Sequence, residues 1–255
     1  MIHAEIAGGA VSTPVHRLDA RAKILGLIGF VVIVVTTPPQ AVWAFVLYAV
    51  VLAFVAGLAR LSPVTLAKRA LVVVPFVIMV AVFLPFFHQD GDPVFSLGGA
   101  RVTDQGLLVL WNVLAKALLG VLSMVVLDLT TTFSELVTGF ERLHTPKVLV
   151  LTVSFMHRYG YLFLEESRRM QRAMASRDFR ARWLGNVPTL GRMLGSLFLR
   201  SYSRGERVYV AMVSRGYEGT IRLEPDGTFG LTEALFVGSV LGAALAVRVA
   251  TAWSA

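Results

Sequence analysis

The sequence predicts an all-α fold: a polytopic membrane protein with about five transmembrane helices and a helical cytoplasmic region. Hydrophobic residues make up 56% of its 255 residues and charged residues 16%, whereas an average soluble domain is about 45–50% apolar and about 25% charged. Mean hydropathy is +0.69, and apolar segments that approach the roughly 20 residues needed to cross a bilayer recur along the chain. The absence of cysteine excludes disulfides, thiolate metal sites and cysteine nucleophiles.

Five apolar segments account for the predicted transmembrane helices. The first is short, and it reaches across a bilayer only if the side chains of Arg21 and Lys23 snorkel to the interface. The third contains two prolines, which membrane helices tolerate where neighbouring groups satisfy the freed carbonyls. The five segments are 24–37, 41–58, 70–87, 106–127 and 231–253.

Loop charges orient these helices. Lysine and arginine concentrate before the first segment and at 59–69, whereas 38–40 is uncharged and 88–105 holds three aspartates and one arginine. Basic residues accumulate on the cytoplasmic side of membrane proteins, so the N-terminus is predicted to lie in the cytoplasm. The predicted regions are a cytoplasmic N-terminal segment at 1–23, four transmembrane helices within 24–127, cytoplasmic helices at 128–230 and a C-terminal transmembrane helix at 231–255.

The long region 128–230 shows helical signals and a basic balance, with 15 lysines and arginines against 10 acidic residues. It begins with a capping box, Thr132-x-x-Glu135, followed by apolar residues at amphipathic spacing. Pro146 ends this pattern. The spacing therefore predicts an amphipathic helix over 132–143.

The next segment, 147–164, is apolar but contains His157 and Arg158 near its middle. A charged arginine at the centre of a bilayer costs about 2.5–3.5 kcal/mol. We interpret this segment as a helix that lies at the inner membrane face or against other helices, and not as a sixth span.

One short pattern occurs twice in the cytoplasmic region. The sequence at 173–179, Ala-Met-Ala-Ser-Arg-Asp-Phe, returns 38 residues later at 211–217 as Ala-Met-Val-Ser-Arg-Gly-Tyr. A charged, helix-favouring run precedes each copy, so each copy is predicted to end a helix at an arginine and a turn-capable residue. Two such helix ends suggest docking onto a two-lobed partner; the alternative is a pair of ordinary basic helices near anionic lipid. The candidate residues are Ser176, Arg177 and Asp178 in the first copy and Ser214, Arg215 and Gly216 in the second.

These motifs resemble a known family. The segment His16-Arg17-Leu18-Asp19-Ala20-Arg21-Ala22-Lys23 is similar to the Leu-Asp-Pro-Arg-x-Lys motif at the start of the T components, the transmembrane subunits of energy-coupling factor (ECF) transporters. The Ser-Arg-Asp and Ser-Arg-Gly sites resemble the paired Ala-Arg-Gly signatures of that family, and residues 199–209 and 215–219 are similar to its cobalt-type, CbiQ-like branch. The chain departs from the pattern where Ala20 replaces proline, where serine precedes both arginines and where Asp178 replaces glycine.

The resemblance implies a scaffold and coupling subunit. A T component links a membrane substrate-binding subunit to a pair of ATP-binding-cassette (ABC) ATPases, whose grooves receive two arginine-tipped helices, here assigned to Arg177 and Arg215. The resemblance also implies cobalt as the transported substrate, with nickel or a vitamin left open, and location in the bacterial cytoplasmic membrane. Independently, no lysine follows a glycine, so the chain lacks a phosphate loop, and no catalytic residue or cofactor is expected in it.

Residues outside the repeat carry weaker signals. The five histidines show no close pair at metal-ligand spacing, so no metal site is predicted. Lys116 lies inside a predicted span, where it either pairs with a carboxylate or lines a polar interface. A stripe of small residues on the last span is typical of a helix-packing face, within the subunit or against a partner; it consists of Gly238, Gly242, Ala246 and Ala250.

Two other classes of function compete with the scaffold. A self-sufficient secondary transporter or channel would show inverted repeats of spans and polar residues at mid-membrane, whereas the repeat found here lies in the predicted cytoplasmic region. A membrane-embedded enzyme, such as a lipid-phosphate transferase, would need clustered acidic residues at the inner face, and the cytoplasmic acids are scattered. Nucleic-acid binding is not needed to explain the net charge of +8, because cytoplasmic loops of membrane proteins are basic.

Overall fold

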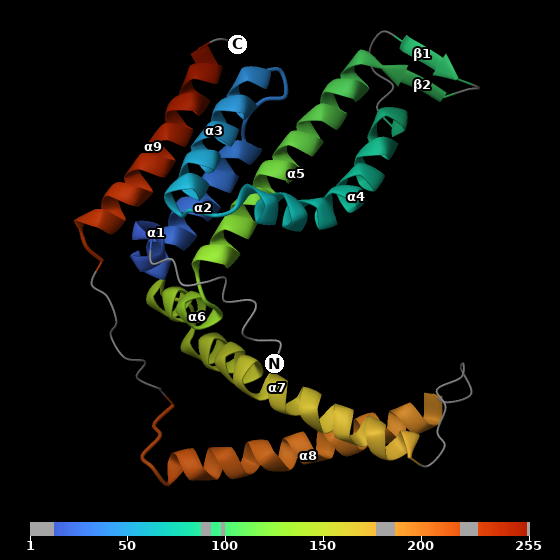
Figure 1. The fold of residues 1–255 in the computed structure, drawn as a ribbon, viewed down its shortest axis with the longest axis vertical. Coiled ribbons are helices and arrows are strands. Elements are labelled where there is room, and N and C mark those ends of the chain that lie inside the picture. Colours follow the sequence, from blue (N-terminus) through green and yellow to red (C-terminus); the bar gives the residue numbers. More distant parts are fainter. Residues whose placement is uncertain (1–12, 88–92, 98–99, 177–186, 220–228, 254–255) are drawn as a thin grey trace. The chain divides into compact units, whose positions relative to one another are not determined.

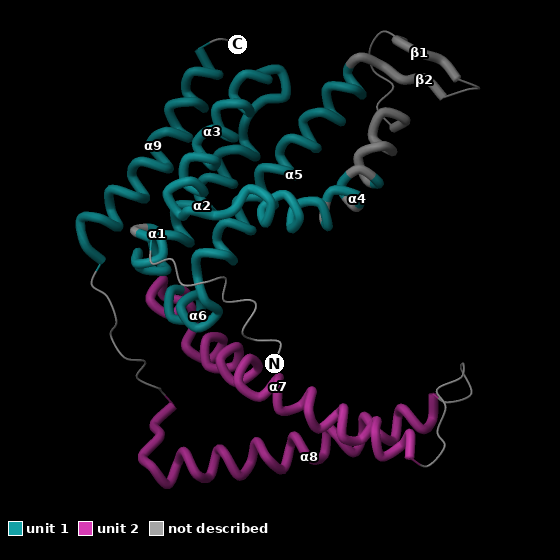
Figure 2. The backbone as a smooth tube through the Cα atoms, viewed as in Figure 1, with its two compact units in different colours: residues 1–139, 226–255 teal, residues 140–225 magenta. Residues whose placement is uncertain are grey.

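Helices in the predicted order make up most of the protein, whose structure here is a computed structural model (Figure 1). The structure describes residues 13–87, 93–97, 100–176, 187–219 and 229–253. The chain divides into a first unit of residues 1–139 with 226–255 and a second unit of residues 140–225 (Figure 2). The prediction of an all-α membrane-type fold is confirmed.

The helices of the first unit carry the five apolar segments, one on each of α2, α3, α4, α5 and α9. Helix α2 starts earlier than its apolar segment because Asp19 caps it, accepting a hydrogen bond from the backbone N–H of Arg21 at 2.9 Å. It stops before the two prolines at 38 and 39, which cannot continue a helix. The bounds are α1 Pro14–Arg17, α2 Ala20–Val35, α3 Val42–Leu58, α4 Pro63–Phe87, α5 Asp104–Thr130 and α9 Leu231–Trp253.

The core of this unit forms around α2, which packs against both α5 and α9. Phe30 and Tyr48 are buried and meet edge to face with ring centroids 5.8 Å apart. The hydroxyl of Tyr48 forms a hydrogen bond with that of Thr37 at 3.0 Å, so its polar tip is satisfied within the apolar bundle. Two glycines of α2 face α9, where side chains of Phe236 and Leu241 occupy the space beside them.

Two helices among the described residues have the length and composition to cross a membrane, Gln105–Thr130 and Leu231–Trp253. Val42–Leu58 is a shorter apolar helix, and α4 continues through its prolines at 75 and 85, as the sequence predicts. The five-span topology stays a prediction.

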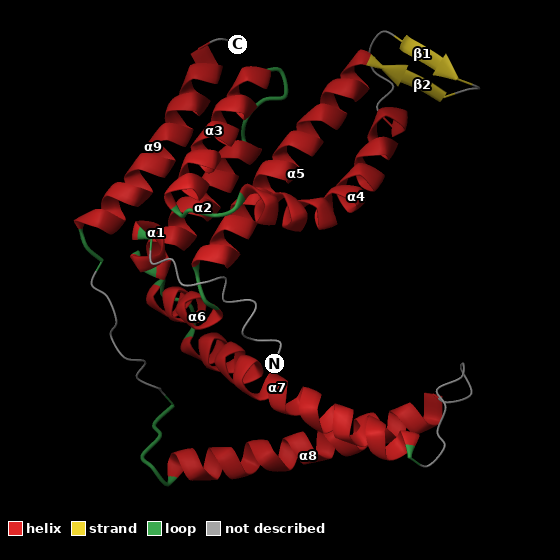
Figure 3. Cartoon of the chain, in the orientation of Figure 1, coloured by secondary structure: helices red, strands yellow, loops and turns green. Residues whose placement is uncertain are grey.

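A short β-hairpin, which the sequence analysis did not predict, lies between α4 and α5 (Figure 3). Its antiparallel strands are β1 (Pro93–Leu97) and β2 (Ala100–Thr103), with Leu97 opposite Ala100. The sequence between them is a Gly-Gly pair, which is typical of two-residue hairpin loops. This signal was available in the sequence and was missed.

Helix α6 (Phe133–Arg142) starts at the predicted capping box, which is confirmed. The backbone N–H of Thr132 donates to Glu135 Oε2 at 3.0 Å, and the backbone N–H of Glu135 donates to Thr132 Oγ1 at 3.4 Å. These two bonds satisfy donors at the helix start that no intrahelical carbonyl can reach.

The second unit consists of two long helices that contact each other, α7 (Lys147–Ala175) and α8 (Val187–Val213). Helix α7 joins the apolar segment 147–164 and the charged run after it into one helix. Glu166 of α7 forms ion pairs with Arg200 of α8 and with Arg169 on its own helix. These pairs are exposed, so each contributes at most about 1 kcal/mol.

Candidate functional site

The serines of the repeated motif end their helices in the same local geometry. The backbone N–H of Ser176 donates to Arg172 O at 3.0 Å, and its hydroxyl donates to Ala173 O at 2.9 Å. Ser214 makes the equivalent bonds, from N–H to the carbonyl four residues earlier at 3.0 Å and from Oγ to the carbonyl three residues earlier at 3.0 Å. The sequence repeat is therefore also a repeat of structure up to these serines.

A left-handed turn at Gly216 ends α8. Gly216 has φ +82°, its N–H donates to Val213 O at 3.0 Å, and the N–H of Tyr217 donates back to Met212 O at 3.0 Å. This pair of bonds is the Schellman motif, in which a glycine adopts a conformation that side chains resist. Arg215 is consequently the C-cap residue, two positions beyond Val213, and it directly precedes the turn, as the sequence predicts.

The side chain of Arg215 is exposed, and within the described ranges no hydrogen bond or ion pair of its guanidinium is found. Arg177 and Asp178, the other predicted residues of the repeat, lie outside the described residues.

Large apolar side chains along α7 and α8 are not buried by the rest of the second unit. No residue of α8 is buried, and Phe198, Leu199 and Val210 are 65–67% exposed. On α7, Met156 is 68% exposed. Exposed large apolar side chains on two amphipathic helices are typical of a protein or membrane contact surface.

Lys23, in the segment that resembles the T-component motif, is buried, so it does not meet the condition of snorkelling that the sequence set for the first apolar segment. Its side chain is 1% exposed, and Nζ donates to His16 O at 3.0 Å and to Thr130 O at 2.8 Å. Burial lowers the pKa of Lys23, while the charges of Glu135 and Asp19 oppose that shift. The Asp19 cap places residue 23 in the first turn of α2, but no local sequence signal indicates that its side chain is buried.

Lys116 donates from Nζ to Val35 O at 2.8 Å. Of the two possibilities that the sequence left open, a polar interface fits the structure, since no carboxylate of the described chain pairs with this lysine. Arg248, near the end of α9, donates to Thr251 Oγ1 at 3.2 Å. Both cations therefore use neighbouring backbone or hydroxyl oxygens.

The small-residue stripe on α9 faces away from the described helices of its own unit. Gly238 and Gly242 are exposed, and a Cβ added at either one would meet no atom within 4 Å. Ala246 is also exposed. Helix α9 instead contacts α2 through larger side chains such as Phe236 and Leu241.

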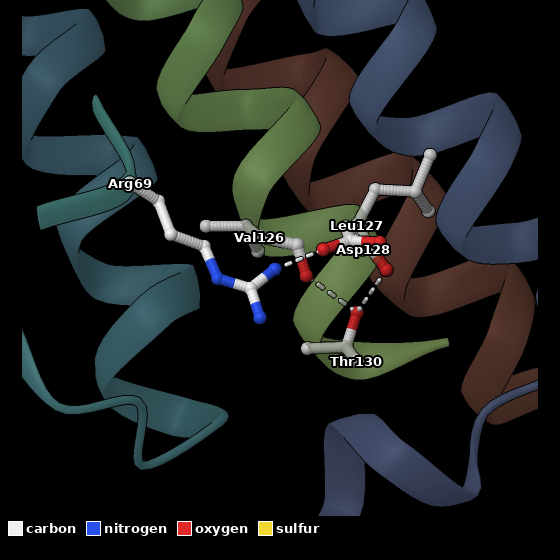
Figure 4. Close-up of polar contacts among 5 residues, drawn as sticks. All are labelled: Arg69, Val126, Leu127, Asp128 and Thr130. Atoms are coloured by element: carbon white, nitrogen blue, oxygen red, sulfur yellow. Dashed lines mark hydrogen bonds and ion pairs between the residues drawn. The ribbon is translucent and has the colours of Figure 1, made fainter. Parts of the chain in front are cut away.

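An ion pair joins α4 to the last turns of α5 (Figure 4). Arg69 Nη1 pairs with Asp128 Oδ2, and in the same region the hydroxyl of Thr130 donates to Val126 O at 2.8 Å and to Leu127 O at 3.3 Å. The Asp128 side chain is 66% exposed, so this pair tethers the helices weakly.

Comparison with known proteins identifies the family. The family described as cobalt transport protein, CbiQ, matches residues 11–226. A putative fused cobalt transport protein CbiMQ of Methanocorpusculum labreanum is 24% identical over 219 residues, which cover 84% of this chain and 36% of that protein. The chain thus spans about a third of the length of this fused relative.

Other relatives carry names from energy-coupled transport. The energy-coupling factor transporter transmembrane protein EcfT of Streptococcus thermophilus is 27% identical over 222 residues, which cover 81% of each chain. A putative ABC transporter ATP-binding protein of Bifidobacterium longum is 25% identical over 236 residues, which cover 85% of this chain and 29% of that protein. The family match covers most of the chain, so the chain belongs to the CbiQ cobalt transport family.

Proposed function

We propose that this chain couples a pair of ABC ATPases to a membrane substrate-binding subunit during cobalt uptake. It would do so as a T component, the transmembrane energy-coupling subunit of an ECF transporter. The observation that carries the proposal is the geometry of Arg215, an exposed guanidinium held at the end of α8 by the turn at Gly216. A guanidinium offers a planar fork of five donors that fits carboxylates or backbone carbonyls in a partner groove.

Two further observations support an ATPase partner. The apolar side chains on α7 and α8 need cover that the second unit does not supply. In addition, a protein named as an ABC transporter ATP-binding protein contains a region similar to this chain over 29% of its length. The matching motif at Ser176 and Arg177 would serve the second ATPase of the pair.

The stripe on α9 is the proposed contact for the substrate-binding subunit, because small residues allow close approach of helices within a membrane. Gly242→Leu should therefore release that subunit and leave the ATPases bound. Gly57→Leu on α3 is a matched control, since a Cβ at either position meets no atom within 4 Å. Equal retention of the substrate-binding subunit by both variants would contradict this contact.

Cobalt is the proposed substrate because the family description and the name of the CbiMQ relative both state cobalt transport. Nickel is the alternative metal, and a vitamin is the alternative class. Uptake of each by the assembled transporter distinguishes them.

The proposed topology is multi-pass, with the N-terminus and region 128–230 in the cytoplasm. Cysteines placed singly at Gly91 and Ser203 in this cysteine-free chain report sidedness. An impermeant thiol reagent applied to intact cells should label position 91 and spare position 203; the reverse pattern would overturn the topology.

Co-purification is the experiment that tests the proposed function. The chain should bring down its ATPases, and ATP turnover should appear only with them, because the chain has no phosphate loop. ATP hydrolysis by the rigorously purified single chain would contradict the proposal.

A further inference from the structure

Three helices meet at one place, here called the α6 joint and formed by Ala20, Lys23, Ile24, Thr130 and Gly139. The final carbonyls of a helix have no intrahelical donor, and at α5 the carbonyl of Thr130 receives the Lys23 ammonium at 2.8 Å. The same ammonium donates to His16 O at 3.0 Å. A cation at the C-terminal end of a helix is favoured by the helix dipole, so Lys23 fastens the end of α5 to the first turn of α2.

Helix α6 packs onto that same turn of α2 without room for a side chain. A Cβ added at Gly139 would lie 2.9 Å from Ile24 Cδ1 and 3.1 Å from Ala20 Cβ. Glu135 of α6 lies close enough to Lys23 for their charges to interact, and its carboxylate is held by the capping box. Only two residues, of which Thr131 is buried, connect α5 to α6.

We propose that Lys23 is a positioning residue that fixes α6 to the transmembrane bundle at the α6 joint. A movement of the coupling helices α7 and α8 is then transmitted through α6 to α2 and α5. Without this attachment, the short connection between α5 and α6 would bend and absorb the movement. This inference rests on the proposed function, because it assigns a path for the coupling.

Lys116 provides a matched comparison within the same pair of helices. Its Nζ donates to Val35 O, near the end of α2, at 2.8 Å, while Lys23 donates to the end of α5. Ser123 bonds to Leu27 O at 3.3 Å between them. The two lysines thus hold opposite ends of α2 against α5, but of the two only Lys23 lies beside α6.

The test is made on the complete transporter, reconstituted with its ATPases and substrate-binding subunit. Lys23→Met keeps much of the stem and removes the ammonium, and we expect Co²⁺ uptake per ATP hydrolysed to fall by about tenfold or more, with ATPase capture unchanged. Lys116→Met should keep the wild-type ratio.

Two outcomes would overturn the proposal. One is a wild-type ratio of Co²⁺ uptake to ATP hydrolysis in Lys23→Met. The other is an equal fall of this ratio in Lys23→Met and Lys116→Met, which would mean that the contact between α2 and α5 is loosened in general. A wild-type complex that binds ATPases without accumulating Co²⁺ would contradict the proposed substrate instead.

A side chain at Gly139 tests the joint even where Lys23→Met does not fold. In Gly139→Ala the added Cβ would lie 2.9 Å from Ile24 Cδ1 and 3.1 Å from Ala20 Cβ, so it pushes α6 away from α2. We expect Co²⁺ uptake per ATP hydrolysed to fall in this variant with ATPase capture unchanged, whereas Gly57→Ala, where a Cβ meets no atom within 4 Å, keeps the wild-type ratio. A wild-type ratio in Gly139→Ala would overturn the proposal.

Discussion

Replacing Gly216 with alanine should weaken ATPase capture by about 5- to 30-fold. Gly216 has φ +82°, a left-handed conformation that costs a residue with a Cβ about 1–2 kcal/mol. A Cβ there would meet no atom within 4 Å, so the backbone penalty acts without a steric one. Because the turn holds Arg215 at the end of α8, the penalty lowers the fraction of molecules that present the arginine for docking.

Gly205 supplies the matched control for this substitution. It lies within α8, where a Cβ also meets no atom within 4 Å, and alanine there should stabilise the helix by about 0.5–1 kcal/mol. Asparagine tolerates the left-handed region better than alanine, so Gly216→Asn should bind with intermediate affinity. The assay is equilibrium binding of the purified ATPases to the chain in nanodiscs. Equal Kd values for wild type and Gly216→Ala would refute the reasoning.

Three further substitutions test contacts within the first unit. Gly29→Val should destabilise the packing of α2 on α9 by about 1–3 kcal/mol, because a Cβ there lies 2.7 Å from Leu241 Cδ2. Thermal stability in detergent should recover partly when Leu241→Ala is added. If the losses of stability in the two single variants simply add in the double variant, the contact is contradicted. Asp128→Asn should cost at most about 1 kcal/mol, since its pair with Arg69 is exposed, and exchanging the two charges should restore it; a loss that the exchange does not recover would argue against the pair. Burial lowers the pKa of Lys23 from its ordinary 10.5, so just below pH 10.5 the unfolded chain binds more protons than the folded one. The free energy of unfolding should then rise with pH through that window in wild type relative to Lys23→Met, and a pH-independent difference would contradict the shift.

Helix ends were predictable where short windows of sequence contain the responsible groups. The capping box at Thr132 and Glu135 formed as predicted, because its donors and acceptors lie three residues apart. The turn after Arg215 was predictable for the same reason, since glycine supplies the positive φ that ends α8. These signals act over one helical turn and do not depend on the rest of the fold.

Contacts between distant segments were not predictable in this way. Lys23 and Thr130 lie 107 residues apart, and a lysine that snorkels has the same local sequence pattern as one that caps another helix. The small-residue pattern on α9 predicted a packing face but left open whether its neighbour lies within the subunit, and in the contact between α2 and α9 the glycines that receive a neighbour are Gly26 and Gly29 on α2. Which faces meet depends on the packing of the whole bundle.

The proposed coupling role is tested most directly by the double variant Arg177→Ala with Arg215→Ala. ATPase pull-down and Co²⁺ uptake are measured in the same preparation of this variant. Truncating one partner of a buried, hydrogen-bonded charge pair costs about 2–5 kcal/mol, which is roughly 30- to several-thousand-fold in affinity. The double variant should insert in the membrane and keep its substrate-binding subunit, but lose its ATPases and its uptake, whereas Arg222→Ala should change little. Wild-type ATPase binding and uptake by the double variant would contradict the proposed coupling through the repeated arginines.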